Sequence, residues 1–376
     1  MKKDFIPFQL ERTMSIWEHQ VEYNLSESGV QPMTVEELLG HDPKLIEDLL
    51  STGLNYPQTN GSIELRDRIA ALYPGATRDN IVVTTGAAQA NFTTLLTLMD
   101  PGDEILVMLP NYMQIWGVAK NYKLNMKTFP LREEIGWAFD PDEMQKMVTN
   151  ETKLIAVCNP NNPTGHIMSQ EERQAVIQAA DRVGAWILSD EVYAGAEHNT
   201  DVITPSLWGD YEKVLAIGSL SKAYALPGLR TGWVAAPRET ADEIWARQDY
   251  ITICATVLAN KLAAQALSPE MRPQLITRTR QFVRAGYKNF EAWFQGNTDM
   301  FTLVPPQAAA IAFVKYHPSV NSSELVDRLI HQQSTYVVPG DHFGLDQHLR
   351  ISYGLSDDYV NEGLRRVLLE LLRSDV

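Results

Sequence analysis

The sequence predicts an α/β protein built on a mostly parallel β-sheet with helices on both faces. Between about residues 60 and 270, short apolar runs alternate with longer helical segments, and this alternation is typical of a parallel sheet covered by helices. The apolar runs are continuous, as strands buried on both faces require. A chain of 376 residues is also long enough for two domains and a large core.

The first forty residues are polar and aromatic and show little strand character. A helix is predicted over residues 33–39, because Thr34 and Glu37 have the spacing of a capping box. Residues 45–50 continue in a helical pattern. We expect residues 1–40 to join a smaller domain and the large domain to begin at residue 41.

The large domain, expected at residues 41–280, contains the predicted sheet. Its strands are the apolar runs at residues 81–83, 104–108, 154–158, 185–188, 214–217 and 232–235, with helices over 86–98 and 171–183. A long helix over 273–294 leads out of it. A smaller α/β domain at residues 281–376 is indicated by strands near 301–304, 310–314, 336–338 and 349–352 and by helices near 323–332 and 357–373.

The composition restricts the functional class. A net charge of −15 and a pI near 5.0 argue against nucleic-acid or anionic-membrane binding, which needs a basic surface. Two cysteines are too few for a disulfide framework. The start of the chain lacks the apolar core of a signal peptide, and no apolar run is long enough for a membrane span. We therefore expect a cytoplasmic protein.

The stretch from Gly218 to Gly232 carries the most informative motif. Ser219 and Ser221 precede Lys222, and Arg230 follows between glycines. Hydroxyl groups and a guanidinium around one amine suit a phosphorylated aldehyde, and pyridoxal phosphate is such a ligand. A lone Ser-x-Ser-Lys is also compatible with a strand-end loop that carries a solvated lysine.

Three further motifs follow predicted strands. Gly86, Ala87 and Ala88 form a small-residue turn that opens a helix, where free amides attract a phosphate. Asn162 lies in a loop that prolines hold rigid. Asp190, at a buried strand end, needs a partner that a pyridinium nitrogen would supply. Taken singly, these motifs also fit tight packing, a β-turn and a helix cap. Their shared place at strand ends predicts one ligand site.

As a set, these motifs resemble those of the fold-type I pyridoxal-phosphate enzymes of the class I/II aminotransferase family, from about Asn24 to Leu372. The resemblance implies the PLP-transferase fold, with a mostly parallel seven-stranded sheet and a smaller α/β domain. It implies that Lys222 forms the Schiff base with the cofactor and acts as general base. It further implies that Asp190 binds the pyridine nitrogen, that Tyr193 and Asn162 contact the ring oxygen, and that Tyr112 stacks on the ring.

The resemblance also implies the remaining contacts. The phosphate would be bound by Ser219, Ser221, Arg230 and the amides of Ala87 and Ala88 beside Gly86, and by Tyr56 of a neighbouring subunit in a homodimer. The α-carboxylate of the substrate would be held by Arg350 in a bidentate pair, with Asn162 and Gly29 close to the substrate. The implied reaction moves the α-amino group of an L-amino acid to a 2-oxo acid by a ping-pong mechanism.

The N-terminal loop leaves the reaction outcome open. The sequence Ser26-Glu27-Ser28-Gly29-Val30 is similar to that of capreomycidine synthase-like members of the family, which cyclise an arginine derivative. A cyclase, lyase or oxidase acting on an arginine-like amino acid is therefore the alternative. A regulatory module that kept the fold is a second one, but the intact Lys222 disfavours it.

Two clusters of charged residues indicate a function less clearly than the motifs above. Glu18, Glu22 and Glu27 would favour a substrate with a cationic side chain, although Glu18 and Glu22 could equally share a solvated helix face. The residues Asp341, His342, Asp346 and His348 show no recognised ligand spacing, and no metal is predicted.

Overall fold

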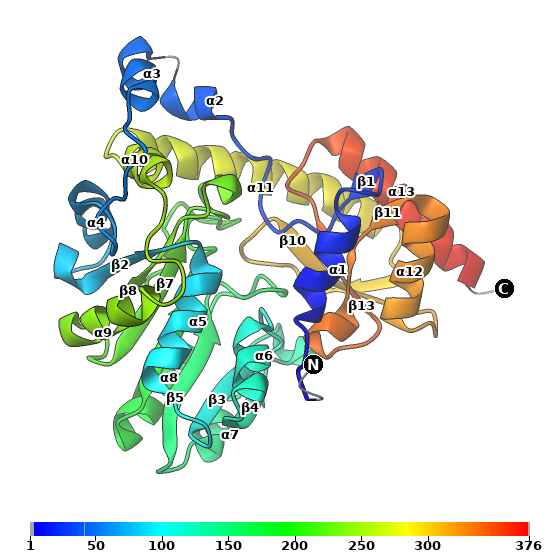
Figure 1. Cartoon of the computed structure of the whole chain (residues 1–376). Coiled ribbons are helices and arrows are strands. Elements are labelled where there is room, and N and C mark those ends of the chain that lie inside the picture. The colour runs from blue at the N-terminus through cyan, green and yellow to red at the C-terminus, as the bar shows by residue number, and fades with distance from the viewer. Residues whose placement is uncertain (1–3, 41, 375–376) are drawn as a thin grey trace.

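The computed structural model describes residues 4–40 and 42–374 (Figure 1). The start of the chain, where no signal peptide is expected, lies partly outside the described residues. Within the described ranges, no helix has the length and apolar character that crossing a membrane requires.

A seven-stranded sheet forms the centre of the larger part of the described chain, in the order β2-β8-β7-β6-β5-β3-β4. Its strands are β2 (Ile81–Thr84), β3 (Glu104–Leu109), β4 (Asn125–Pro130), β5 (Thr152–Cys158), β6 (Trp186–Asp190), β7 (Val214–Ser219) and β8 (Gly232–Ala235). All neighbouring pairs are parallel except those of β8, which runs antiparallel to β2 and β7. The predicted fold class and its six predicted strands are confirmed.

The strand β4 is not among the predicted strands. It lies at the edge of the sheet, and its sequence, Asn-Met-Lys-Thr-Phe-Pro, contains one fully buried side chain, Phe129. An edge strand that faces solvent does not need the continuous apolar run that identifies its neighbours.

Helices cover both faces of this sheet. The helices of this part are α4 (Ile63–Ala70), α5 (Ala87–Leu98), α6 (Gln114–Asn121), α7 (Pro141–Met147), α8 (Gln170–Val183), α9 (Arg238–Gln248) and α10 (Val257–Ala266). Along β3, Ile105 and Val107 pack with α5, α6 and α9, while Leu106 and Met108 pack with α7 and α8 on the other face. Burial on both faces is the physical reason for the continuous apolar runs.

A four-stranded antiparallel sheet, ordered β12-β13-β10-β9, organises the C-terminal part. Its strands are β9 (Phe301–Leu303), β10 (Ile311–Tyr316), β12 (Val338–Pro339) and β13 (His348–Ser352), with helices α12 (Ser322–Gln333) and α13 (Asp357–Ser374). The prediction of a single strand at residues 336–338 is wrong. It is divided between β12 and β11 (Thr335–Tyr336), and β11 pairs with β1 (Tyr23–Asn24) in a separate two-stranded sheet.

The N-terminal segment contributes α1 (Gln9–Trp17) and α2 (Val35–Leu39), and α3 (Pro43–Leu50) follows it. The predicted capping box at the start of α2 is present, since Thr34 and Glu37 satisfy each other's backbone amides. The long helix α11 (Met271–Gln295) runs across the upper half of the view in Figure 1, below α2 and α3. The expected division of the chain at residue 280 falls inside this continuous helix, and the domain limits stay a prediction.

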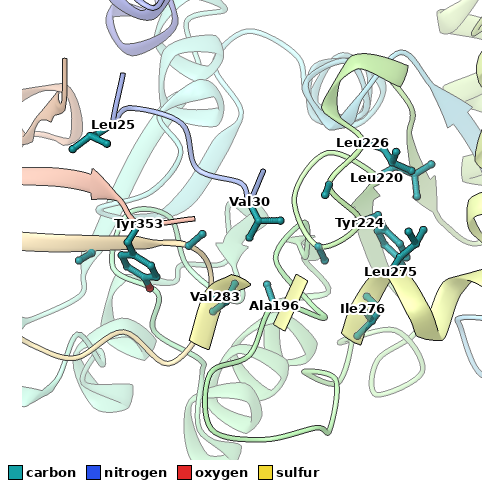
Figure 2. Packing of buried hydrophobic residues seen from close by; sticks show 14 of the residues in the cluster. Leu25, Val30, Ala196, Leu220, Tyr224, Leu226, Leu275, Ile276, Val283 and Tyr353 are labelled. Carbon is teal, nitrogen blue, oxygen red and sulfur yellow. The ribbon is translucent and has the colours of Figure 1, made fainter. Parts of the chain in front are cut away.

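One hydrophobic core joins the larger part of the chain to the C-terminal part, and it packs against the loop that carries Lys222. In Figure 2, Leu220 and Tyr224 lie beside Leu275 of α11, while Val30 and Tyr353 come from the N-terminal segment and the C-terminal part. These side chains are all buried. Because Leu220 and Tyr224 flank Lys222 in the sequence, close packing of the core fixes the loop that carries this lysine.

Candidate active site

A cavity of about 390 Å³ lies at the carboxyl ends of the sheet strands. Its lining includes these predicted site residues: Ala87, Ala88, Tyr112, Asn162, Asp190, Tyr193, Ser219, Ser221, Lys222, Arg230 and Arg350. Most of them lie at or shortly after the carboxyl end of a strand, so the sheet geometry brings together residues that are far apart in the sequence. We call Asn162, Asp190, Tyr193, Ser219, Ser221 and Lys222 the sheet wall.

Three predicted residues do not line the cavity, although two are adjacent to it. A side-chain carbon on Gly29 would lie 3.8 Å from Cδ of Lys222. A side-chain carbon on Gly86 would come within 2.6 Å of Arg230 Nη2, and the φ of Gly86 is +80°, so only glycine is accommodated. Tyr56 is 80% exposed and lies apart from this cavity in the single chain.

Lys222 is placed among groups of both charges. Burial lowers the pKa of its ammonium, and the positive charges of Arg350 and Arg230 act in the same direction. The carboxylates of Glu27 and Glu11 oppose this effect. A lower pKa makes the neutral, nucleophilic amine more accessible, as Schiff-base chemistry requires.

Asp190 ends β6 with a side chain that is 5% exposed. Its Oδ2 accepts a hydrogen bond of 3.0 Å from Asn91 Nδ2, and its Oδ1 accepts one of 3.3 Å from the amide of Val192. Burial raises the pKa of this carboxyl, whereas the hydrogen bonds and Lys222 lower it. Asn91 was not identifiable from sequence, because it lies inside a helix and belongs to no motif.

Two tyrosines lie near Asp190. The hydroxyl of Tyr193 is buried and makes no hydrogen bond of normal geometry within the described residues, although the Ser28 side chain is close enough to oppose the rise in its pKa that burial causes. Tyr112 donates a hydrogen bond of 2.7 Å to Glu11 Oε1, and its ring packs edge-on against Phe8 at 5.1 Å between centroids. A buried hydroxyl without a partner is costly, so Tyr193 is positioned to bind a polar ligand atom.

The phosphate-binding residues predicted from sequence surround the start of α5. Gly86 is the N-cap of this helix and makes no side-chain hydrogen bond, so the first backbone amides of α5 are free to bind an anion. Ser219 and Ser221 lie 2.9 Å apart at their hydroxyls. Arg230 adopts a left-handed conformation, with φ at 48°, and its guanidinium lies against Gly86. Amides, hydroxyls and a guanidinium therefore converge at one end of the cavity.

Arg350 lies in β13, also lines the cavity and is 2% exposed. Its Nη1 donates to Asn162 Oδ1 at 3.0 Å, and its Nη2 donates to the carbonyl of Ser26 at 2.6 Å. Its Nε has no partner in the described part of the chain. A buried guanidinium that is held in place and keeps a free donor is suited to a carboxylate.

Much of the remaining lining comes from the N-terminal segment, and Gln114, Cys158, Val192 and Pro227 complete it. This N-terminal wall consists of Phe8, Leu10, Glu11, Met14, Glu18, Glu27 and Ser28. Of these residues, only Glu18, Glu27 and Ser28 belong to segments that the sequence analysis singled out. The amphipathic spacing of Leu10 and Met14 is a signal for α1, but it does not indicate which part of the protein this helix contacts.

The three predicted glutamates do not act together. Glu18 and Glu27 line the cavity, whereas Glu22 forms an ion pair of 2.9 Å with Arg366 of α13. The interpretation in which Glu18 and Glu22 share one helix face is wrong, because α1 ends at Trp17. Burial raises the pKa of Glu18, and the negative charge of Glu27 adds to this.

The two aspartates considered for a metal site have other partners. Asp341 accepts hydrogen bonds from Asn321 and Ser323, and Asp346 accepts one from the amide of Ser322. These contacts fix the N-terminal end of α12. Among the described residues, no group of three or more His, Cys, Asp or Glu side chains has the arrangement of a metal site.

The donor set of the cavity fits pyridoxal phosphate. The cavity brings together an amine, a set of phosphate-binding groups and an arginine suited to a carboxylate. The buried Asp190 forms no ion pair within the described residues, although the charge of Lys222 lowers its pKa against the effect of burial, and the Tyr193 hydroxyl makes no hydrogen bond of normal geometry there. The ring nitrogen and ring oxygen of the cofactor would supply both.

Comparison with known proteins gives relatives over almost the whole chain. Capreomycidine synthase of Streptomyces vinaceus is 29% identical over 357 residues, which cover 94% of this chain and 90% of the relative. Tyrosine aminotransferase of Dictyostelium discoideum is 26% identical over 345 residues, covering 86% and 82%. The crystal structure of a PLP-dependent aminotransferase from Streptococcus suis 89-1591 superimposes with a TM-score of 0.92 at 30% identity and covers all of both chains.

The family described as aminotransferase class I and II matches residues 25–367. The family and its structural neighbours are pyridoxal-phosphate-dependent enzymes. This agrees with the resemblance carried by the Ser-x-Ser-Lys and Asp-Glu-x-Tyr motifs and with the fold. The chain therefore belongs to the aminotransferase class I and II family.

Proposed function

We propose that the protein is an aminotransferase that moves the α-amino group of an L-amino acid to a 2-oxo acid by a ping-pong mechanism. The observation that carries this proposal is the common placement of Lys222, Asp190 and Arg350 on one cavity. An amine that holds the cofactor, a carboxylate for its ring nitrogen and a guanidinium for the substrate carboxylate are the groups that this reaction requires.

Pyridoxal phosphate, when bound, supplies a ring that withdraws electrons from the substrate's Cα. Asp190 would hold the proton on the ring nitrogen, and Tyr193 and Asn162 would contact the ring oxygen. The hydroxyls of Ser219 and Ser221, the Arg230 guanidinium and the amides that start α5 would bind the phosphate. Tyr112 would lie against the ring.

Lys222 would perform the proton transfer. Burial lowers the pKa of its ammonium, which favours the neutral amine, and its Nζ would take the proton from the substrate Cα. Arg350 would bind the α-carboxylate through its Nη atoms and its unpartnered Nε. The contacts of Arg350 with Asn162 and Ser26 fix the guanidinium before the substrate arrives, which lowers the entropic cost of binding.

The test combines trapping with product analysis. Borohydride reduction of the holoenzyme should attach the cofactor to Lys222, as peptide mass spectrometry would show. Addition of the correct amino acid should release one 2-oxo acid and leave the cofactor as pyridoxamine phosphate, which a second 2-oxo acid reconverts. Attachment to a different lysine, or to none, would contradict the site.

A second candidate is a cyclase, lyase or oxidase that acts on an arginine-like amino acid. It is favoured by Glu11, Glu18 and Glu27, which give the cavity a negative potential opposite Arg350 and Lys222. The similarity to capreomycidine synthase also supports this second candidate. Comparing kcat/KM for arginine, glutamate, alanine and phenylalanine separates the two. Consumption of arginine without net pyridoxamine phosphate would place the second candidate first.

We further propose that the protein is a cytoplasmic homodimer in which Tyr56 reaches the phosphate of the partner's cofactor. Leu50, Leu54 and Tyr56 are 81%, 80% and 80% exposed in the single chain, and a second copy could cover such apolar side chains. Mixing Tyr56→Phe chains with Lys222→Ala chains should restore one intact site in each heterodimer. No recovery of activity after mixing and chain exchange would contradict shared sites.

A further inference from the structure

The amide of Asn91 lies next to the carboxylate that the proposed function assigns to the cofactor ring. Asn91 belongs to the first half of α5, the helix whose N-terminus supplies Ala87 and Ala88. Its side chain is 1% exposed, and its Nδ2 donates to Asp190 Oδ2 at 3.0 Å. Because an amide hydrogen bond to a buried carboxylate is charge-assisted, this contact is stronger than one between neutral groups.

The orientation of the Asn91 amide is fixed by acceptors on two sides. The carbonyl of Ala88 can only accept, so Gln114 must turn its Nε2 toward it, and the two atoms are 2.7 Å apart. Gln114 Oε1 is then 3.4 Å from Asn91 Nδ2. The Asp190 carboxylate also only accepts, so both contacts require the nitrogen of Asn91. Its Oδ1 is consequently left without a donor in residues 4–40 and 42–374.

The same network fixes the carboxylate of Asp190. Asn91 binds Oδ2, and the amide of Val192 binds Oδ1 at a longer distance of 3.3 Å. A carboxylate accepts more hydrogen bonds than these two, so capacity remains for the cofactor. We propose that Asn91 is a positioning residue, whose amide fixes Asp190 in the orientation that receives the ring nitrogen of pyridoxal phosphate. This inference rests on the role proposed above for Asp190.

Loss of the Asn91 amide should weaken cofactor binding. Asn91→Leu keeps nearly the same volume and removes the donor. We expect the Kd for pyridoxal phosphate to rise roughly tenfold to a hundredfold, as for a lost hydrogen bond to a charged group. The pH dependence of the cofactor's visible absorbance should shift as well, because Asp190 interacts with the ring nitrogen. In an Asp190→Asn background, Asn91→Leu should cost much less, since the charged partner is gone.

The apoprotein provides a test that does not depend on activity. Burial raises the pKa of Asp190, while Asn91, the Val192 amide and Lys222 lower it. The other titratable groups that face it are the Cys158 thiol and the hydroxyls of Tyr112 and Tyr193. Burial raises the pKa of each of these groups, and the negative charge of Asp190 adds to the effect, so they stay neutral at neutral pH.

A carboxyl whose pKa is raised by folding contributes stability at low pH that is lost as the pH rises toward its folded pKa. Without the Asn91 amide, this pKa rises further. The Tm of apo Asn91→Leu should therefore fall further below that of the native apoprotein at about pH 8 than at about pH 5. At the lower value, the pH is closer to the pKa of an aspartate in the unfolded chain, roughly 3.9. A purely structural defect would lower the Tm equally at both pH values.

Thr94→Val is the matched control. Thr94 lies in the same helix, is fully buried, and its hydroxyl has no partner in the described ranges. Its Kd and its pH-dependent Tm should match the native protein. If Asp190→Asn binds the cofactor normally, the proposed role of Asp190 is wrong. If Asp190→Asn binds it weakly but Asn91→Leu changes neither Kd nor the pH dependence of the Tm, the inference about Asn91 alone is overturned.

Discussion

The sheet wall of the cavity consists of residues at or near the ends of buried strands, whereas the N-terminal wall comes from a surface helix and a loop. Asp190 and Ser219 are the last residues of β6 and β7, and their positions follow from the packing of the sheet. Glu11 and Glu18, in contrast, lie in or at the end of α1, which has one fully buried residue, Leu10. The groups proposed for the chemistry therefore lie on the buried sheet, while the groups that would contact the substrate side chain lie on a more exposed element.

This difference predicts that changes in the sheet wall abolish the reaction for every substrate. The largest effect is expected for Lys222→Ala, which would remove both the proposed attachment point of the cofactor and the proposed base. Turnover should fall by at least roughly 10²- to 10⁴-fold for all amino acids, the range of a lost general base. Borohydride should no longer attach the cofactor covalently. Retention of turnover with covalent attachment elsewhere would contradict the assignment.

A smaller but still general effect is expected at Arg350. Arg350→Lys keeps the charge but loses the planar pair of donors and the contacts with Asn162 and Ser26. We expect KM to rise by roughly thirtyfold, equivalent to about 2 kcal/mol, for amino acids with any side chain. An unchanged KM in Arg350→Lys would show that the α-carboxylate binds elsewhere.

The same division explains what could be predicted from the sequence. Lys222, Asp190 and Asn162 lie in short local motifs at or near the ends of apolar runs. The alternation of apolar runs and helical segments predicts the fold, and the strand ends predict the common location of these residues. β4 and β1 escape prediction because they are short or lie at an edge, with few buried side chains. Asn91 and Glu11 reach the site only through tertiary contacts, and neither residue carries a local signal.

At the N-terminal wall, substitutions should change the preference for a substrate rather than the reaction. Glu27→Gln removes a charge that faces Lys222 and the cavity. We expect kcat/KM for arginine to fall by roughly fivefold, about 1 kcal/mol, with little change for alanine. Glu22→Gln is the matched control, because Glu22 pairs with Arg366 outside the cavity. Equal losses for arginine and alanine would show that the glutamate does not contact the side chain.

The smallest expected effect is a pH dependence of this preference that originates at Glu18. Burial raises the pKa of Glu18, and the negative charges of Glu27 and Glu11 act in the same direction, while His19 and Lys222 oppose them. Only the ionised carboxylate attracts a cationic side chain, so the attraction is complete above the raised pKa and is lost as the pH falls through it.

The ratio of kcat/KM for arginine to that for alanine should therefore decline on acidification, by roughly threefold, starting at a higher pH than for a glutamate of ordinary pKa near about 4.3. The ratio is the appropriate measurement, because titration of Lys222 affects both substrates equally and cancels. In Glu18→Gln the ratio should be lower at neutral pH, and its decline between neutral and moderately acidic pH should disappear. A ratio in the native enzyme that stays flat over this range would remove Glu18 from the recognition of the side chain, and would leave Glu27 as the carboxylate to be tested in the same way.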